Sequence, residues 1–277
     1  MIETGYIYAV TGKIYRDLAV RSARSLRTIH PEAEIDLYTD RPEEIENGDI
    51  FNQIHPLSES WFRPKMEAMI ETRFERALYL DADTMVVADL SSVFDVLKRF
   101  DIAMTHDSNE AGSDALYFHR NEVPEAFVAP NSGVMGVRKS DRTQTFLKAW
   151  QKEVRESGAD RDQPALRKLL FESDLRLYIL SPMFNFMAFL DLETRAGSQG
   201  APRLLHAPGL HEHSIKPSSV PLTMEELVGG RHATQVKALI AADRRLTPPD
   251  RLKTVIPPIE ATMLRRLRRL ARRLLKS

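Results

Sequence analysis

The sequence predicts an α/β protein with a mostly parallel central sheet flanked by helices. Short apolar runs rich in β-branched and aromatic residues alternate with segments whose apolar residues recur at helical spacing. Hydrophobic residues make up 43% and charged residues 28% of the 277 residues, so the chain can bury an ordinary globular core. One apolar run, Ala77–Leu80, ends directly at two acids, and ligands of open α/β sheets collect at such strand ends.

The first three elements are predicted to form a βαβ unit. Tyr6–Val10 and Ile35–Thr39 are apolar runs of strand length. Between them, Tyr15–Ile29 places its apolar residues on one helical face. Two strands joined through a helix pair in parallel, so this unit starts a parallel sheet.

The same two patterns continue along the chain to about residue 207. Pro64 suits the first turn of a helix, with Met66, Met69 and Ile70 as the buried stripe, and Ala77–Leu80 is a third strand. The stretch Ala207–Pro221 is rich in Pro, Gly and His and is predicted to be loop. Further predicted strands are Asp101–Thr105, Ser132–Val137, Leu177–Leu180 and Arg203–Leu205, and further predicted helices are Thr143–Glu156 and Pro164–Phe171.

The C-terminal segment differs in charge from the rest of the chain. Residues 251–277 carry nine Lys and Arg and one acid, whereas residues 1–250 carry thirty basic and thirty-eight acidic residues. We therefore expect one folded domain at 1–250 and a basic amphipathic helix at 251–277. In 260–277 apolar residues recur at helical spacing among six Arg and one Lys, a pattern that suits an anionic membrane surface. Packing on the domain, or dimerisation, would bury the same apolar face.

Composition also bounds the compartment and the partners. The absence of cysteine excludes disulfides, thiolate metal sites and a cysteine nucleophile. No basic segment precedes a long apolar run at the N-terminus, and no run of about 18 apolar residues occurs. We expect a cytoplasmic protein with peripheral contact to the inner face of the membrane through 260–277. Nucleic acid is not an expected partner, because residues 1–250 are net acidic.

Asp81 and Asp83 are the candidate metal ligands. Side chains alternate along an extended chain, so the two acids of Asp-Ala-Asp can face the same way at the end of their strand. Two carboxylates form a hard-oxygen site for Mg²⁺ or Mn²⁺, which a diphosphate can complete. The same acids could instead serve as turn or helix-cap residues, since Asp-x-Asp alone is common.

Five segments carry a resemblance to a known family. They read FRPKMEAM, RALYLDADTMVVADLSSVFD, NSGVMGV, DQPALRKLL and LLHAPG, in this order, within residues 5–210. Together they resemble GT-A-fold nucleotide-sugar glycosyltransferases, most of all glycosyltransferase family 8, which includes glycogenin and bacterial lipopolysaccharide glycosyltransferases. The resemblance implies a GT-A fold and a cofactor of Mn²⁺ or Mg²⁺.

The resemblance implies a metal site of Asp81, Asp83 and His206. The family places a later His in a pattern like His-x-x-Gly-x-x-Lys-Pro-Trp, and His206-Ala-Pro-Gly matches its first half. The second half departs from the pattern, because Lys216 comes four residues late and no Trp follows Pro217. Lys216 is still expected near a phosphate, and His211 and His213 are rival ligands.

The resemblance also implies donor-binding and catalytic residues. Each of these residues could instead be an ordinary strand end, surface charge, turn residue or helix cap. The implied donor-binding residues are Ala9, Val10, Thr11, Arg63, Lys65, Asn131, Ser132, Gly133 and Lys216, and the implied catalytic pair is Asp162 and Gln163.

The expected reaction is transfer of a hexose from a nucleoside diphosphate sugar, with UDP as the expected nucleotide, to a hydroxyl of a glycan or lipid-linked acceptor. Retention of anomeric configuration is implied by the resemblance only. Two other classes stay open. A sugar-phosphate nucleotidyltransferase would need a Gly-rich loop after the first strand, where this chain reads VTGKIYRD with one Gly. A non-catalytic nucleotide-sugar or metal-binding protein would keep the same acids without turnover.

Overall fold

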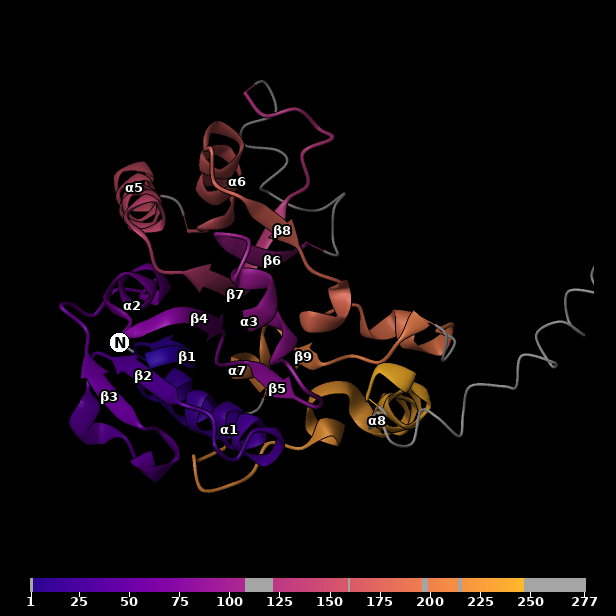
Figure 1. Cartoon of the computed structure of the whole chain (residues 1–277). Coiled ribbons are helices and arrows are strands. Elements are labelled where there is room, and N and C mark those ends of the chain that lie inside the picture. Colours follow the sequence, from indigo (N-terminus) through magenta and orange to yellow (C-terminus); the bar gives the residue numbers. More distant parts are fainter. Residues whose placement is uncertain (1, 108–121, 159, 196–198, 214–215, 247–277) are drawn as a thin grey trace, which may run out of the picture.

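The protein is represented by a computed structural model that describes residues 2–107, 122–158, 160–195, 199–213 and 216–246 (Figure 1). The strands are β1 (Ile2–Val10), β2 (Ile35–Thr39), β3 (Gln53–Pro56), β4 (Phe74–Leu80), β5 (Thr84–Val86), β6 (Ile102–His106), β7 (Pro130–Arg138), β8 (Leu177–Ile179) and β9 (Leu204–His206). The helices are α1 (Lys13–Ile29), α2 (Lys65–Glu71), α3 (Ser92–Leu97), α5 (Asp141–Ser157), α6 (Gln163–Glu172), α7 (Leu210–His213) and α8 (Met224–Ala242). Short 3₁₀ turns occur at Pro42–Glu44, Gly48–Ile50, Pro182–Phe184, Phe189–Glu193 and Arg244–Leu246.

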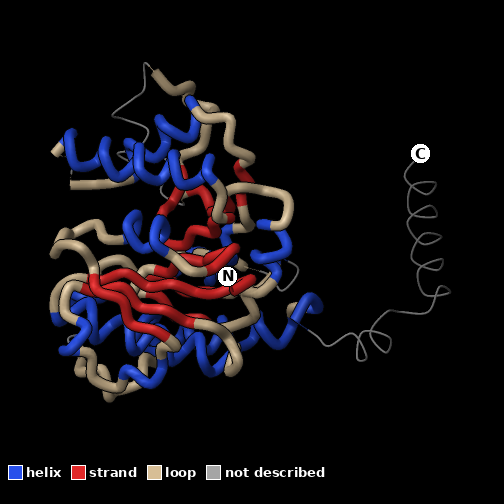
Figure 2. Tube along the Cα trace, turned by 60° about the vertical axis from the view of Figure 1, so that its left-hand side comes forward, coloured by secondary structure: helices blue, strands red, loops and turns tan. Residues whose placement is uncertain are grey.

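A seven-stranded sheet of order β3-β2-β1-β4-β7-β6-β8 forms the centre of the molecule. Strands β3, β2, β1 and β4 pair in parallel, as do β6 and β8, and β7 is antiparallel to both of its neighbours. The predicted α/β fold with a mostly parallel sheet is therefore confirmed, and so is its opening βαβ unit. Figure 2 shows the strands as a layer between two layers of helices.

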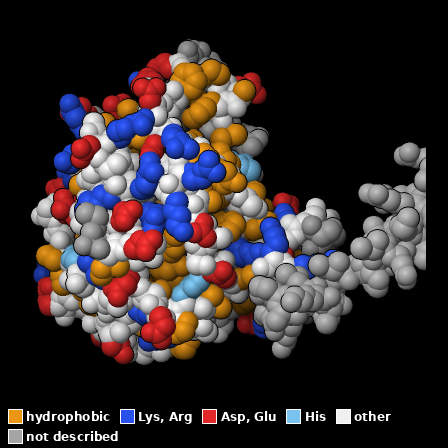
Figure 3. Space-filling model, viewed as in Figure 1, with side chains coloured by type: hydrophobic (Ala, Val, Ile, Leu, Met, Phe, Trp, Pro, Cys, Tyr) orange, Lys and Arg blue, Asp and Glu red, His pale blue; other side chains and the backbone are white. Residues whose placement is uncertain are grey.

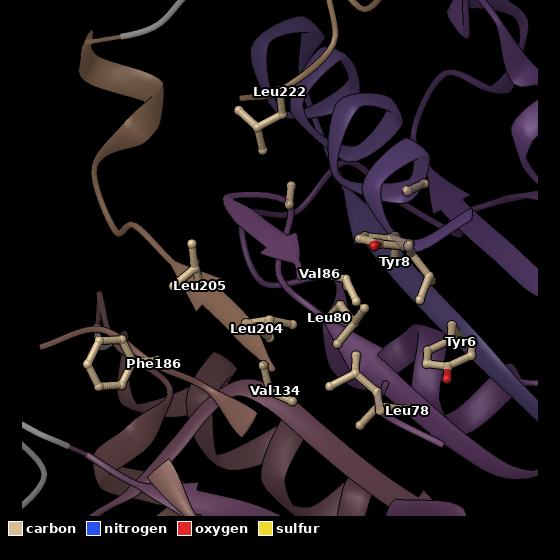
Figure 4. Close-up of a cluster of buried hydrophobic side chains, with 14 of the residues drawn as sticks. Tyr6, Tyr8, Leu78, Leu80, Val86, Val134, Phe186, Leu204, Leu205 and Leu222 are labelled. Atoms are coloured by element: carbon tan, nitrogen blue, oxygen red, sulfur yellow. The ribbon is translucent and has the colours of Figure 1, made fainter. Parts of the chain in front are cut away.

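Each face of the sheet carries its own hydrophobic core, because side chains alternate along a strand. On β1, Tyr6, Tyr8 and Val10 pack toward α1 and β9, whereas Ile7 and Ala9 pack toward α2, α5 and α6. Figure 4 shows part of the first core, with side chains of β1, β4, β5 and β9 gathered together. The sheet is thus buried on both faces, which leaves its strand ends as the place for polar chemistry.

A second, two-stranded sheet brings a late part of the chain to the end of β4. Strand β5 follows β4 after a short turn and pairs antiparallel with β9, so that Thr84 lies opposite His206. Strand β7 begins where β4 ends, because the two are antiparallel, and Asp81 N–H donates to Gly133 O at 2.8 Å. The carboxyl end of β4 therefore meets the start of β7 and the end of β9.

The structure differs from the predicted elements at several places. Ala207–Pro221 is not all loop, since the short helix α7 lies within it. Strands β3 and β5 and helices α3 and α8 were not predicted. The expected amphipathic helix at 251–277 lies outside the described residues.

The face of the molecule in Figure 3 shows acidic and basic side chains interspersed, with hydrophobic side chains between them. This mixture agrees with a chain whose formal net charge is zero. Within the described part of the chain, no helix combines the length and the apolar character needed to span a bilayer.

Candidate active site

A cavity of about 610 Å³ lies at the strand ends described above. The end of β1 contributes Ala9 and Val10, with Thr11 directly after it. The turn after β4 contributes Asp81 and Asp83, and the start of β7 contributes Asn131–Gly133. Of the predicted donor-binding, catalytic and metal residues, all except Lys216 line this cavity. Its further lining residues are Tyr15, Phe62, Pro64, Tyr79, Ala82, Asp107, Arg161, Met187, Pro208, Gly209 and His211.

Asp81, Asp83 and His206 form a cluster on the cavity wall. One ligand atom of each lies within 4.8 Å of the others. Nε2 of His206 is 3.2 Å from Asp83 Oδ1 and 4.0 Å from Asp81 Oδ2. The local backbone fixes this convergence, because Thr84 Oγ1 donates to Asp81 O at 2.7 Å and Ala207 N–H donates to Asp83 O at 3.0 Å. The two acids therefore do face the same side, as their spacing predicted.

The electrostatics of the cluster favour its charged forms. Burial opposes ionisation of Asp83, but the adjacent His206 outweighs it, so the pKa of the Asp83 carboxyl lies below its ordinary value. Burial likewise opposes charge on the imidazole, but Asp83 and Asp81 outweigh it and raise the pKa of His206. Two carboxylate oxygens and an imidazole nitrogen around one point are a donor set that fits a divalent cation such as Mn²⁺.

Lys65 lies between the Asp81–Asp83–His206 cluster and Asp162, the predicted catalytic acid. Its buried Nζ lies 3.3 Å from Asp81 Oδ1 and 3.5 Å from Asp162 Oδ2, and it donates to Ser132 Oγ at 3.1 Å. Burial disfavours the charged amine, but Asp162 and Asp81 outweigh it and raise the pKa of Lys65. Tyr79 adds a hydroxyl that donates to Asp81 Oδ1. Asp81 Oδ1 is thus contacted by both Lys65 and Tyr79.

Asp162 occupies the N-cap position of α6, but its side chain makes no capping hydrogen bond. It turns instead toward Ser132, whose Oγ donates to Oδ2 at 2.8 Å, and toward Lys65. Burial raises the pKa of Asp162, whereas Lys65, Arg63 and Ser132 outweigh it, and the net pKa lies below the ordinary value. An Asp162 that acted only as a helix cap would not need to pair with the buried Lys65 or to line the cavity. This arrangement therefore suits the predicted role of Asp162 in the site.

The remaining predicted residues divide into two groups. Thr11 donates to Trp61 O at 3.2 Å, and Arg63 Nε lies 3.8 Å from Asp162 Oδ1 at the cavity edge. Lys216 lies outside the cavity lining, because its Nζ binds Glu226 Oε2 at 2.9 Å. Its predicted contact with the donor stays a prediction.

Two lining residues, Asp107 and Tyr79, and one residue behind the lining, Asn185, were missed by sequence reasoning. Asp107 directly follows β6, the same strand-end signal that identified Asp81, and could have been found that way. Tyr79 precedes Asp81 by two positions and shares its face of the strand, which the alternation also predicts. Asn185, which accepts from His206 Nδ1 at 2.8 Å, had no such signal.

Comparison with known proteins identifies the family and the fold. Residues 27–218 match the nucleotide-diphospho-sugar transferase family. Among curated proteins, no sequence matches this chain.

Solved structures share the fold at low sequence identity. Galactosyltransferase LgtC, in complex with donor and acceptor sugar analogs, is 14% identical with a TM-score of 0.56, over 90% of this chain and 99% of that one. Glycosyltransferase GlyE of Streptococcus pneumoniae TIGR4 is 16% identical with a TM-score of 0.57, over 87% of this chain and 64% of that one. Mouse xyloside xylosyltransferase 1 is 14% identical with a TM-score of 0.51, over 75% of this chain and 98% of that one.

These matches confirm the resemblance to GT-A-fold nucleotide-sugar glycosyltransferases similar to family 8. The match spans β2 to β9 and includes the acids after β4 and the histidine of β9. The chain therefore belongs to the nucleotide-diphospho-sugar transferase family.

Proposed function

We propose that this protein is a metal-dependent hexosyltransferase that uses a nucleoside diphosphate sugar, with UDP as the nucleotide, and a hydroxyl acceptor on a glycan or lipid-linked glycan. The observation that carries the proposal is the convergence of Asp81, Asp83 and His206 beside the buried Lys65 in one cavity. Such a site is built for a cation and the diphosphate that binds it.

The metal would be held by Asp81 Oδ2, Asp83 Oδ1 and His206 Nε2. When bound, Mn²⁺ or Mg²⁺ offsets negative charge on the departing nucleoside diphosphate. Lys65 orients Asp81 through their 3.3 Å contact, and its positive charge adds to the favourable potential for an anionic leaving group.

The donor would lie along the rest of the lining. The end of β1 at Ala9–Thr11 is proposed to hold the nucleoside. Asn131–Gly133 and Arg63 are proposed to contact the sugar or its phosphates. Asp162 and Gln163 are proposed to lie near the reacting carbon, where Lys65 and Ser132 keep Asp162 as a carboxylate that accepts a hydrogen bond from a sugar hydroxyl.

The test is release of free nucleoside diphosphate from a panel of nucleotide sugars, with and without Mn²⁺. We expect turnover with at least one UDP-hexose, and loss of Mn²⁺-dependent UDP binding and of turnover in Asp83→Asn. Asp95→Asn is the matched control, because Asp95 is an exposed acid of α3 outside the cavity. Undiminished turnover by Asp83→Asn would refute the assignment, and binding without turnover would favour a non-catalytic protein.

Retention of anomeric configuration is part of the proposal and has its own readout. The anomeric coupling constant of the newly formed product, followed by NMR from the first minutes, should match that of the donor. An inverted anomer would leave the transferase assignment intact and remove the proposed stereochemistry.

A separate proposal concerns the basic segment. We propose that residues 251–277 form a helix that holds the enzyme on an anionic membrane at the cytoplasmic face, near a lipid-linked acceptor. Vesicles with phosphatidylglycerol should co-sediment the full chain, and vesicles of phosphatidylcholine alone should not. Equal recovery with both vesicle types, or equal binding by a chain ending at residue 250, would contradict it.

A further inference from the structure

Asn185 lies behind His206 on the side away from the cavity acids. It follows the 3₁₀ turn Pro182–Phe184 and is buried, with 4% of its surface exposed. The next residue pairs with β9, because Phe186 N–H donates to Leu204 O and His206 N–H donates to Phe186 O, each at 3.0 Å. This pairing brings the Asn185 side chain to Nδ1 of His206, at 2.8 Å.

The orientation of the Asn185 amide is fixed by a chain of hydrogen bonds that begins at the backbone. The N–H of Gly133, which can only donate, lies 2.9 Å from Asn131 Oδ1. Asn131 Oδ1 is therefore an acceptor, and the Asn185 atom 2.8 Å from it must be the donor Nδ2. Turning the Asn131 amide around would place its NH₂ against a backbone N–H, so this alternative is excluded.

Oδ1 of Asn185 therefore faces His206. A carbonyl oxygen can only accept, so Nδ1 of His206 must carry a proton. In the neutral imidazole the lone pair then lies on Nε2, the atom 3.2 Å from Asp83 and 4.0 Å from Asp81. This lone pair faces the oxygens of the two acids, where a cation held between them would accept it.

We propose that Asn185, locked by Asn131, is a positioning residue that holds His206 in its Nδ1–H tautomer and thereby aims Nε2 at the cation between Asp81 and Asp83. The metal half of this inference rests on the proposed function, whereas the tautomer can be tested without metal. Partners behind a ligating histidine commonly set its metal affinity by 10- to 100-fold.

The first experiment reads the tautomer in the metal-free protein. Imidazole ¹H–¹⁵N correlation spectra at alkaline pH distinguish protonated Nδ1 from protonated Nε2, and the His206 signals are assigned by their loss in His206→Gln. We expect Nδ1–H in the wild type. In Asn185→Leu, which removes the acceptor, we expect a shift to Nε2–H, because that nitrogen can then donate to Asp83.

The second experiment measures Mn²⁺ affinity in the presence of UDP, from the electron paramagnetic resonance signal of free Mn²⁺. Asn185→Leu should bind Mn²⁺ about 10- to 100-fold more weakly. Asn185→Asp keeps an acceptor for Nδ1 and should stay within about threefold of the wild type, even though it loses the donor to Asn131. Asn52→Leu is the matched control, because Asn52 accepts from a backbone N–H far from the cavity, and thermal unfolding is followed for all variants.

The outcomes separate this inference from the proposed function. A wild type that binds no Mn²⁺ would overturn both. A wild type that binds Mn²⁺ but shows protonated Nε2 would overturn this inference alone, as would undiminished Mn²⁺ affinity in Asn185→Leu.

Discussion

Nζ of Lys65 lies 3.3 Å from Oδ1 of Asp81, at the point where the start of α2 meets the carboxyl end of β4. The lysine is 5% exposed, and Asp162 lies 3.5 Å from it on the other side. The buried ammonium group of Lys65 therefore pairs both with Asp81 of the Asp81–Asp83–His206 cluster and with Asp162, the predicted catalytic acid. Without Lys65, the partly buried carboxylate of Asp81 and the buried carboxylate of Asp162 would lose the positive charge that offsets their negative charges.

Lys65→Met should destabilise the fold as well as impair the site. We expect a loss of about 3–5 kcal/mol in the free energy of unfolding, because breaking a buried ion pair leaves uncompensated charge. Urea denaturation of the metal-free protein at neutral pH measures it. The control is Lys98→Met, since Lys98 is exposed and pairs with Asp95 within α3, and we expect a change of less than about 1 kcal/mol. Equal effects of the two substitutions would show that Lys65 compensates no buried charge.

Gly133→Ala should block the proposed cation site through a single methyl group. A Cβ at this position would lie 2.4 Å from Cε1 of His206 and 2.9 Å from Oδ2 of Asp81, so both ligands would have to move. We expect Mn²⁺ affinity and turnover to fall by at least about tenfold, since displaced ligands no longer converge. Gly230→Ala is the control, because a Cβ there meets no atom within 4 Å. Unchanged Mn²⁺ affinity in Gly133→Ala would contradict the site as described.

Glu226→Gln should loosen the segment that runs from Lys216 to α8. Arg21 of α1 is fully buried, and its Nη2 donates to both Glu226 oxygens, at 2.8 and 2.7 Å. Removing the negative charge should cost about 3–5 kcal/mol of unfolding free energy, because the guanidinium stays buried.

The neighbouring substitution Glu225→Gln is the matched control for this anchor. Glu225 pairs with Lys237 on the surface, and its loss should cost less than about 1 kcal/mol. Hydrogen exchange should rise in 216–226 for Glu226→Gln and not for Glu225→Gln. A larger effect of Glu225→Gln than of Glu226→Gln would mean that Arg21 is held by its hydrogen bonds to the backbone oxygens of Val220 and Pro221 alone.

Asp243 should make the fold sensitive to acid. Its hydrogen bond from Arg245, together with backbone donors and Arg203, holds the pKa of this carboxyl well below its usual range despite burial. A lowered folded-state pKa stabilises the protein above the unfolded pKa of about 3.9, and this stabilisation is lost as pH falls through the folded value.

Asp243→Asn tests this linkage directly. The variant should be less stable than the wild type at neutral pH, and the difference should shrink as the pH is lowered below about 4. Chemical denaturation at a series of pH values measures it. A difference that stays constant over this range would show that the charge of Asp243 contributes nothing.

The sequence predicted the elements whose apolar runs are long enough to show a period. Helix α1 and strands β1, β2, β4 and β7 were found because each is buried on at least one full face. Strand β3 contains a proline and lies at the sheet edge, so it shows no alternation that can be recognised. Strand β5 begins directly after the turn that follows β4, so it does not stand apart as a separate apolar run. Helix α8 is interrupted by Gly229 at φ 75°, which breaks its helical pattern.

The site was predictable only in part. Asp81 and Asp83 could be found from the residues themselves, because a buried strand ends at them. Donor-side residues such as Asn131 came from the resemblance, since nothing in their spacing indicates a ligand. Asn185 could not be found either way: its role depends on a backbone pairing between Phe186 and β9 that only the folded chain reveals.

Because β9 comes late in the chain, the Asp81–Asp83–His206 cluster is completed late during synthesis of the protein. A nascent chain that ends before His206 contains Asp81 and Asp83 but lacks both the His206 imidazole and β9, the strand that pairs with β5. Because β5 and β9 are far apart in the sequence, the three candidate ligands come together only after β9 has been synthesised and has paired with β5. A chain that ends before β9 would have Asp81 and Asp83 without His206, and should bind a divalent cation more weakly than the full-length chain.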